Sequence, residues 1–142
     1  VLALHADQPL AAILRARALE NLKGQEGFKD LAQVFKRVVN IIKKFGAKDE
    51  FDQWDLLGQD VEKTLLSRIE GVENKVQPLL AAGDYAGLLA EIADLRGPVD
   101  DFFDQVLVDD PDPQIKEARI ALLSRAERLF EHISDFSRIS TS

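Results

Sequence analysis

Basic and amide side chains recur on one stretch of the chain, from residue 36 to residue 44. Lys36, Arg37, Asn40, Lys43 and Lys44 follow one another at spacings of one, three and four residues, which place side chains on one surface of an α-helix. Ammonium and guanidinium groups bind phosphates, and an asparagine amide both donates to and accepts from a base edge. The pattern predicts a surface whose lysines bind RNA phosphates and whose Arg37 and Asn40 read bases.

The distribution of charge favours the same stretch. The 142-residue chain has a formal net charge of -7, whereas residues 28–45 hold five basic residues and one acidic residue, a net +4 that leaves -11 for the rest. A positive helix on an acidic protein attracts phosphate locally, within about 8 Å at physiological salt. Lys29, on the same helix, and Arg15 and Arg17, on an earlier one, extend the expected patch. The alternative interpretation is a solvated helix face, because lysines lie outside on any soluble protein.

Other chemistry finds little support in the residues. The chain has no cysteine, and its two histidines, His5 and His132, lie far apart. Three acidic clusters, at residues 49–55, 100–104 and 109–112, lack the ligand order of a calcium loop, and helix capping explains them more simply. Neither a phosphate-cradling glycine loop nor a nucleophile with its base occurs. We therefore expect that this chain binds no metal and no cofactor and catalyses no reaction. The sequence also has no apolar run long enough for a membrane helix.

Helical periodicity fixes the expected elements around the basic stretch. A helix is predicted to start at Asp7 to Leu10, with Pro9 in its first turn, and to end at Gly24. Its core-facing residues would be Leu10, Ile13, Leu14 and Ala18. The basic helix is expected over residues 28–45, with Gly46 as its C-terminal cap and an inward face of Phe28, Leu31, Val34, Phe35, Val38, Val39, Ile41, Ile42 and Phe45.

Two longer helices show seams close to a heptad repeat. The first covers residues 59–82 and carries Val61, Leu65, Ile69, Val72, Val76 and Leu79; the second covers residues 114–139 and carries Ile115, Ala118, Leu122, Ala126, Leu129, Ile133 and Phe136. Such seams suit packing along another long helix. Between them, Asp84 is expected to cap a short helix to residue 95, and Pro98 to open another. Residues 140–142 would be a polar tail.

The sequence thus predicts a single all-α domain over residues 1–142, a bundle of five or six helices. Because methionine is absent even at position 1, we expect the chain to be a fragment of a longer one. An acidic connector at residues 46–58, which carries Phe51 and the only tryptophan, Trp54, separates the basic helix from the first long helix.

One segment is more specific than any of these patterns. Residues 95–108 read LRGPVDDFFDQVLV, which resembles the L-R-x-P-V-D-x-F-F-D-x-V-M-V stretch near the C-terminus of the bacterial glycyl-tRNA synthetase beta subunit. The closing segment of that family is similar to residues near the end of this chain, namely Arg119, Leu122, Leu123, Leu129, Phe130 and Asp135-Phe136-Ser137. Residues 36–42, KRVVNII, look like the K-R-x-x-N-I-L element of DALR-type anticodon-binding domains, and residues 79–85 match an L-L-x-x-G-D-Y turn. Leu107 and Ile42 depart from the family's usual methionine and leucine, and Trp54 with its connector matches no motif.

The resemblance implies a DALR-type anticodon-binding domain at the C-terminus of that beta subunit. It implies that tRNA for glycine is the ligand and that the alpha subunit is a partner in an alpha2beta2 tetramer in the cytoplasm. The alpha subunit would bind ATP, Mg and glycine and carry out the chemistry of the glycine–tRNA ligase. The fragment would bind tRNA but catalyse no step. We expect neither DNA nor a membrane as a partner. Two alternatives stay open: a helical protein-interaction module, with the long-helix seams exposed to a partner, and the anticodon-binding domain of an arginyl-tRNA synthetase.

Overall fold

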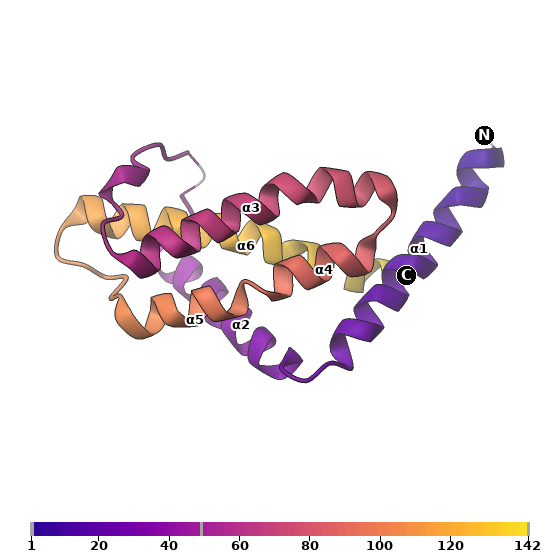
Figure 1. Ribbon diagram of the computed structural model, residues 1–142, viewed down its shortest axis with the longest axis horizontal. Coiled ribbons are helices and arrows are strands. Elements are labelled where there is room, and N and C mark those ends of the chain that lie inside the picture. The colour runs from indigo at the N-terminus through magenta and orange to yellow at the C-terminus, as the bar shows by residue number, and fades with distance from the viewer. Residues whose placement is uncertain (1, 49, 142) are drawn as a thin grey trace.

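The computed structural model describes residues 2–48 and 50–141, with side chains for residues 10, 12–48 and 50–133. Its elements are α1 (Leu2–Lys23), α2 (Phe28–Phe45), the short 3-10 helix η1 (Trp54–Leu56), α3 (Asp60–Ala82), α4 (Tyr85–Ala93), α5 (Arg96–Gln105) and α6 (Pro113–Thr141) (Figure 1). Within the described residues there is no strand, and the predicted all-α fold is confirmed.

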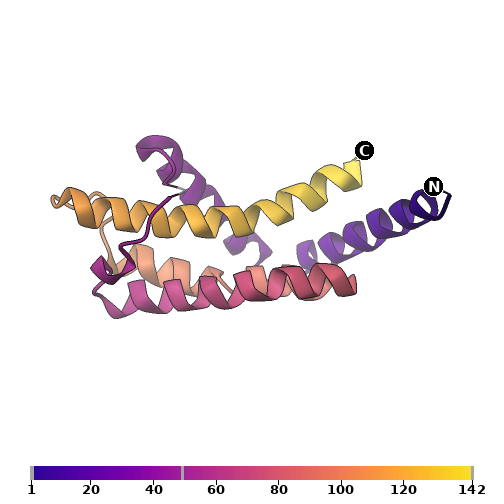
Figure 2. The same ribbon diagram turned by 90° about the horizontal axis from the view of Figure 1, so that it is seen from above.

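The two long helices, α3 and α6, run side by side along the long axis of the molecule, as Figures 1 and 2 both show. The short helices α4 and α5 follow one another along α3, and α2 packs against α6 and α5. The C-terminal half of α1 packs against α4 and α6 at one end of the bundle, and its N-terminal half extends away from the bundle (Figure 2). The basic helix is therefore backed by two elements that come much later in the chain.

The seams predicted for the long helices are buried between elements of this chain. Leu65, Ile69, Val72 and Val76 of α3 are buried, as are four residues of the α6 seam, Ala118, Leu122, Ala126 and Leu129. The ends of both seams are half-buried, and the Phe136 side chain lies outside the described residues. The alternative in which these seams are exposed to a partner protein is therefore wrong for the residues that the structure describes.

Helix α2 agrees with the sequence in its ends and its faces. Leu31, Val34, Val38 and Ile42 are buried, because apolar residues three and four apart share one side of a helix. Gly46 adopts φ 86° after the last turn, and its N–H donates to the Ile42 carbonyl at 2.7 Å. That left-handed region favours glycine, which makes Gly46 an effective stop.

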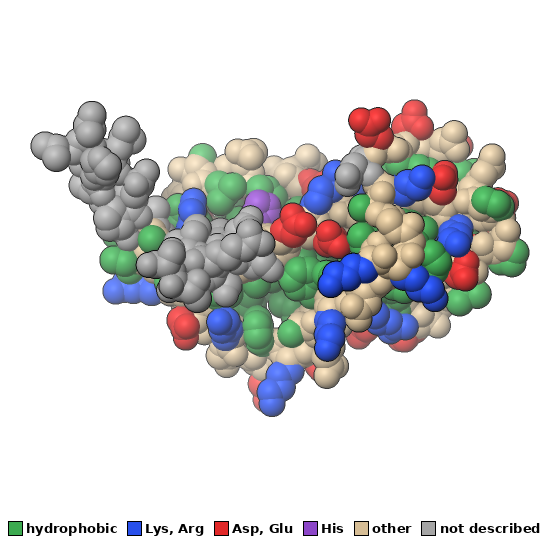
Figure 3. All heavy atoms as spheres, turned by 180° about the vertical axis from the view of Figure 1, so that it is seen from behind, with side chains coloured by type: hydrophobic (Ala, Val, Ile, Leu, Met, Phe, Trp, Pro, Cys, Tyr) green, Lys and Arg blue, Asp and Glu red, His purple; other side chains and the backbone are tan. Residues whose placement is uncertain are grey.

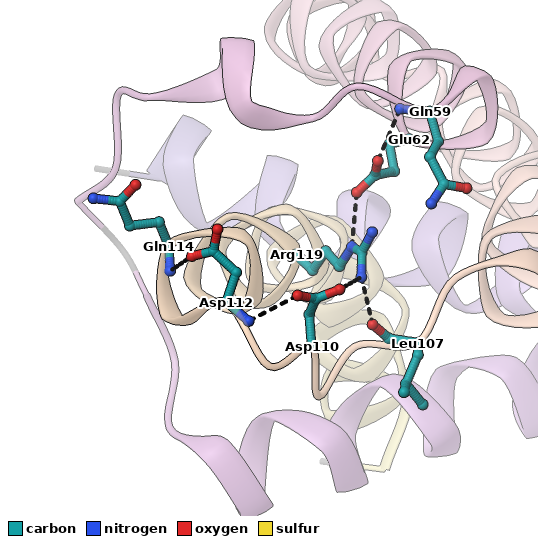
Figure 4. A network of polar contacts seen from close by, with 7 residues as sticks. All are labelled: Gln59, Glu62, Leu107, Asp110, Asp112, Gln114 and Arg119. Carbon is teal, nitrogen blue, oxygen red and sulfur yellow. Dashed lines mark hydrogen bonds and ion pairs between the residues drawn. The ribbon is translucent and has the colours of Figure 1, made fainter.

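A buried ion pair joins the start of α3 to α6, and its arginine also holds the loop before α6 (Figure 4). Arg119 Nε donates to Glu62 Oε2 at 2.9 Å, and the two side chains belong to residues that are 5% and 1% exposed. The other Glu62 carboxylate oxygen accepts the Gln59 N–H at 3.0 Å, which completes a capping box on α3. Arg119 Nη1 also donates to the Leu107 carbonyl at 2.6 Å and to Asp110 at 3.1 Å. The pair therefore fixes the loop that follows α5.

The first helix corrects the sequence prediction. Helix α1 begins at Leu2, so Pro9 lies inside it, at the cost of one backbone hydrogen bond. Leu10, Ile13 and Leu14 do not face the core: they are 56%, 49% and 39% exposed, whereas Ala18 is buried as predicted. The reason is that α1 enters the bundle only through its C-terminal half, where Leu19 and Leu22 join Ala18 in the core.

Smaller corrections concern helix ends. Helix α4 ends at Ala93, and α5 begins at Arg96, two residues before Pro98; the proline still lies in the first turn, where its missing N–H is not needed. Helix α6 continues to Thr141, so the polar tail predicted from residue 140 is wrong for residues 140 and 141.

Candidate nucleic-acid interface

The basic side chains of α2 lie on the outside of the bundle, as predicted. Gln33 is exposed, and so are all six residues of this helix that were predicted to contact RNA: Lys29, Lys36, Arg37, Asn40, Lys43 and Lys44. Figure 3 shows lysine and arginine side chains gathering in the lower part of this view, over α2. We call Lys36, Arg37, Asn40, Lys43 and Lys44 together the α2 surface.

Arg37 is held in place by an aromatic ring of another helix. Its guanidinium carbon lies 4.2 Å from the centroid of the Phe103 ring in α5, a distance at which the ring face attracts a cation. Phe103 is buried and packs at 5.8 Å against Phe102, so α5 offers Arg37 a fixed platform. A guanidinium held in this way keeps its planar donors available for a phosphate or a base edge.

A hollow of about 220 Å³ lies beside Arg37. Ile41, Lys44 and Phe45 line it from α2, and the end of α5 with its following loop closes the other side, through Phe103, Val106, Leu107, Val108 and Asp109. Leu107 is 69% exposed there. Apolar and aromatic surface next to cations is the chemistry that accepts a splayed RNA base.

The aromatic part of this arrangement could not be predicted from the sequence. Phe45 belongs to the predicted inward face of the basic helix, and nothing in the spacing of Phe45 or Phe103 indicates that they border a surface hollow. Two cations, Lys44 and Lys116, lie 5.2 and 4.5 Å from the Phe45 ring centroid. Lys116 also forms an ion pair with Asp109 at 3.1 Å. The start of α6 and the loop before it thus lie beside the α2 surface, which only the tertiary packing reveals.

Acidic residues limit the positive surface at the start of α2. Asp30 forms an ion pair with Arg96 of α5 at 3.7 Å, and Asp100 shares a small hollow with Asp30 and Arg37. Lys29 is exposed next to Asp30. The cationic character is therefore concentrated in the second half of the helix, from Lys36 to Lys44.

Arg15 and Arg17 do not join the α2 surface. Arg17 is exposed, and Arg15 is half-buried, with its guanidinium carbon 5.0 Å from the Tyr85 ring of α4. Helix α1 packs against α4 and α6, whereas α2 packs against α5 and α6. Any contact of these two arginines with RNA would be separate from the α2 surface, and their role in RNA binding stays a prediction.

The remaining predicted chemistry concerns acids and histidines. Within the described residues, no group of three or more histidine, aspartate or glutamate side chains could hold a metal ion. Asp84 and Asp112 cap helices: they accept the backbone N–H of Gly87 at 3.0 Å and of Gln114 at 2.9 Å. His132 is half-buried on α6, and the His5 side chain lies outside the described residues. Among the helices that the structure describes, none combines the length and the apolar character that a membrane span requires.

Comparison with known proteins supplies a family context for this surface. Over residues 31–141 the chain matches the family described as DALR anticodon binding domain. It is 36% identical to a protein of Haemophilus influenzae over 137 residues, which are 96% of this chain and 19% of the relative. A relative in Syntrophotalea carbinolica is 36% identical over 99% of this chain and 20% of its own length. A third, in Desulforapulum autotrophicum, is 42% identical over 90% of this chain and 19% of its own length.

All three relatives carry the name "Glycine--tRNA ligase beta subunit". The chain spans about a fifth of the length of these curated relatives. The match to the domain family begins at Leu31, within α2, and so includes the whole α2 surface.

Proposed function

Because the chain belongs to the family of DALR anticodon-binding domains, we propose that it binds the anticodon arm of a tRNA through the α2 surface. The observation that carries the proposal is the exposure of all five polar residues of that surface, Lys36, Arg37, Asn40, Lys43 and Lys44. In this role the lysines contact phosphates and position the RNA, whereas Arg37 and Asn40 contact bases of the loop.

The names of the relatives favour tRNA for glycine as the ligand, in preference to the arginine tRNA of the second DALR-type enzyme considered above. The chain then supports the attachment of glycine as part of a longer beta subunit in the cytoplasm. An alpha subunit is the proposed partner, in an alpha2beta2 assembly, and it supplies the site for ATP and Mg. The chain itself contributes binding energy and selection rather than a chemical step.

The aromatic hollow adds a way to read a base. A base turned out of the anticodon loop stacks on the guanidinium of Arg37 or enters the space between Phe45 and Leu107. Base–aromatic stacking contributes about 1–3 kcal/mol per base. The nearby lysines hold the flanking phosphates, so positioning and reading occur on one side of α2.

A titration of the purified chain with a fluorescently labelled anticodon stem-loop of glycine tRNA tests the proposal. We expect saturable binding at low salt. The double variant, in which Lys43→Ala and Lys44→Ala are combined, should bind every stem-loop more weakly and to the same degree, because phosphate contacts carry no sequence information. Lys63→Ala is the matched control: it removes an exposed lysine from α3 and should leave the affinity unchanged.

Two results would contradict the proposal. One is the absence of saturable binding by the wild-type chain at low salt. The other is an equal loss of affinity in the Lys63→Ala control and in the α2 variants, because the effect would then reflect net charge rather than a surface. In either case the exposed lysines of α2 would be a solvated helix face.

A further inference from the structure

A second cavity lies away from the α2 surface, where the connector crosses from α2 to α3. Its volume is about 440 Å³, within the range of small-molecule sites. We call it the tryptophan cavity, and it is lined by Lys48, Phe51, Trp54, Glu73, Val76, Gln77, Arg125, Arg128, Leu129 and His132. None of its lining residues belongs to α2, so it is not part of the surface described above.

One wall of the cavity is aromatic and fixed in position. The rings of Phe51 and Trp54 meet edge to face, with centroids 4.9 Å apart. The guanidinium carbon of Arg125 lies 4.9 Å from the centroid of the Trp54 ring. Glu73 holds that guanidinium through two hydrogen bonds, one from Nε at 3.1 Å and one from Nη2. Three residues, Phe51 of the connector, Glu73 of α3 and Arg125 of α6, thus order the only tryptophan of the chain.

The floor and the rim have different chemistry. Val76 and Leu129 are buried and give an apolar floor. Gln77 is exposed at the edge of the cavity, and its amide both donates and accepts hydrogen bonds.

Cations predominate around the cavity. Three of its lining residues are lysine or arginine, against the single carboxylate of Glu73. Lys48 is positioned by its backbone N–H, which donates to Ser124 at 3.1 Å, and by an ion pair with Glu117 at 3.0 Å. Arg128 is exposed. With Glu73 paired to Arg125 and Glu117 paired to Lys48, the three cations still outnumber these carboxylates by one, which favours an anionic over a cationic ligand.

From this arrangement we infer that the tryptophan cavity binds one nucleotide unit. The base lies between the Phe51–Trp54 wall and the apolar floor, with its polar edge toward Gln77. The phosphate lies at the rim, near Lys48 and Arg128. Aromatic rings that stack bases and cations that hold phosphates are the two features that sites for single-stranded nucleic acid combine. The ligand is an unpaired nucleotide of an RNA or a free nucleotide, which present the same chemistry to the cavity.

The inference does not rest on the proposed role of the α2 surface. The two sites use different residues, and α6 lies between α2 and α3 in the bundle (Figure 2). An RNA that occupies both would have to pass around α6. Nucleotide binding at the tryptophan cavity can therefore succeed or fail independently of anticodon binding.

Trp54 is itself the reporter, because it is the only tryptophan. We would follow its fluorescence while adding the four ribonucleoside 5′-monophosphates, then a short oligouridine, with ribose 5-phosphate as the control without a base. The inference expects saturable quenching by at least one nucleotide or by the oligouridine, and none by ribose 5-phosphate. Quenching by the mononucleotides identifies a site open to free nucleotides, whereas quenching by the oligouridine alone identifies a nucleotide of RNA as the ligand.

Variants assign the signal to the cavity. Phe51→Leu and Gln77→Ala keep Trp54, and we expect Phe51→Leu to lose about tenfold in affinity, within the range for one stacked base. Gln77→Ala changes an exposed side chain, so its result does not depend on refolding of the wall. Two control variants should leave the quenching by mononucleotides unchanged: Lys63→Ala, and the double variant that combines Lys43→Ala and Lys44→Ala.

Three results would overturn the inference: no saturable quenching by any nucleotide or by the oligouridine; equal quenching by ribose 5-phosphate; or unchanged affinity in both Phe51→Leu and Gln77→Ala. The aromatic pair would then serve only to cover the groove between α3 and α6. None of these results would bear on the stem-loop titration, which measures the α2 surface.

Discussion

At the residue scale, Arg119 connects the core to the candidate RNA surface. Its guanidinium joins Glu62 at the start of α3 to the Leu107 carbonyl and to Asp110 in the loop before α6. The same loop lines the hollow beside Arg37. The sequence singled out Arg119 only through a resemblance; the structure supplies the physical reason for an arginine at this position.

We expect Arg119→Ala to destabilise the fold by about 3–5 kcal/mol, because it leaves the Glu62 carboxylate buried without its partner. Chemical denaturation followed by circular dichroism measures the change. The control is Arg68→Ala, which removes an exposed arginine from α3 and should change the free energy of unfolding by less than about 0.5 kcal/mol. Similar values for the two variants would show that the buried pair does not stabilise the start of α3.

Arg37 and its platform give a second prediction at this scale. Arg37→Lys keeps the charge but loses the planar guanidinium over Phe103. We expect it to bind stem-loops with the same salt dependence, and to lose about 1–3 kcal/mol of discrimination between glycine and other anticodons. Paired titrations with a glycine stem-loop and an anticodon-substituted one measure the difference. Full discrimination by the lysine variant would mean that Arg37 acts through its charge alone.

At the element scale, the turn between α1 and α2 depends on one glycine. Gly27 has φ 89°, and a Cβ atom added there would collide with Arg96 Nη1. That arginine donates to the Gly27 carbonyl at 3.3 Å and forms the ion pair with Asp30. The start of α2 is therefore tied to α5 at a position where only glycine avoids both strain and collision.

Gly27→Ala should lower the free energy of unfolding by about 1–2 kcal/mol, since the left-handed conformation alone costs an L-residue that much. The matched substitution Gly71→Ala, inside α3 where a Cβ meets no atom within 4 Å, should instead stabilise by about 0.5–1 kcal/mol. Thermal unfolding of the two variants shows the sign directly. A neutral or stabilising Gly27→Ala would contradict the described turn.

The elements also show what local sequence can predict. Helices α2, α3 and α6 follow from apolar spacings, and the end of α2 and the start of α4 follow from the cap residues Gly46 and Asp84, because these signals act within a few residues. The exposed half of α1 could not be predicted, since Leu10, Ile13 and Leu14 have the spacing of a buried face. Whether such a face is buried depends on which helices reach it, and that is decided by the tertiary packing.

The same limit applies to the sites. Exposure of Lys36 to Lys44 followed from the helical pattern and is confirmed. The platform under Arg37 joins residues 66 positions apart, and the stack of Arg125 on Trp54 joins residues 71 positions apart. The spacing of apolar residues along the sequence cannot indicate contacts between such distant positions. The unplaced tryptophan of an acidic connector was the only signal in the sequence that pointed toward the second cavity.

At the scale of the whole molecule, the chain is a bundle without a catalytic constellation in its sequence. We expect the purified chain to show no glycine-dependent exchange between ATP and pyrophosphate, because no glycine loop cradles phosphates and no nucleophile is paired with a base. The exchange assay with radiolabelled pyrophosphate measures this. Exchange above that of a heat-denatured sample would overturn the assignment of a purely binding role.

The segregation of charge also belongs to the whole molecule. Residues 28–45 carry a net +4 and the rest of the chain carries -11. An anticodon stem-loop held by the α2 surface lies within a Debye length of its lysines, but its outer parts face an acidic protein. Binding to the isolated chain should therefore be weak, and the lysines of α2 should account for most of its salt dependence.

This argument predicts the slope of the logarithm of affinity against the logarithm of salt concentration. Each phosphate contact that is lost should reduce the magnitude of the slope by about 0.7–0.9. Lys43→Ala and Lys44→Ala should each produce that change, whereas Asn40→Ala should leave the slope unchanged, because it removes no charge. Stem-loop titrations at several salt concentrations measure the slopes. A slope that stays the same when Lys43 and Lys44 are both replaced would place the phosphate contacts elsewhere on the molecule, since an RNA bound at the α2 surface must release fewer counterions once these cations are gone.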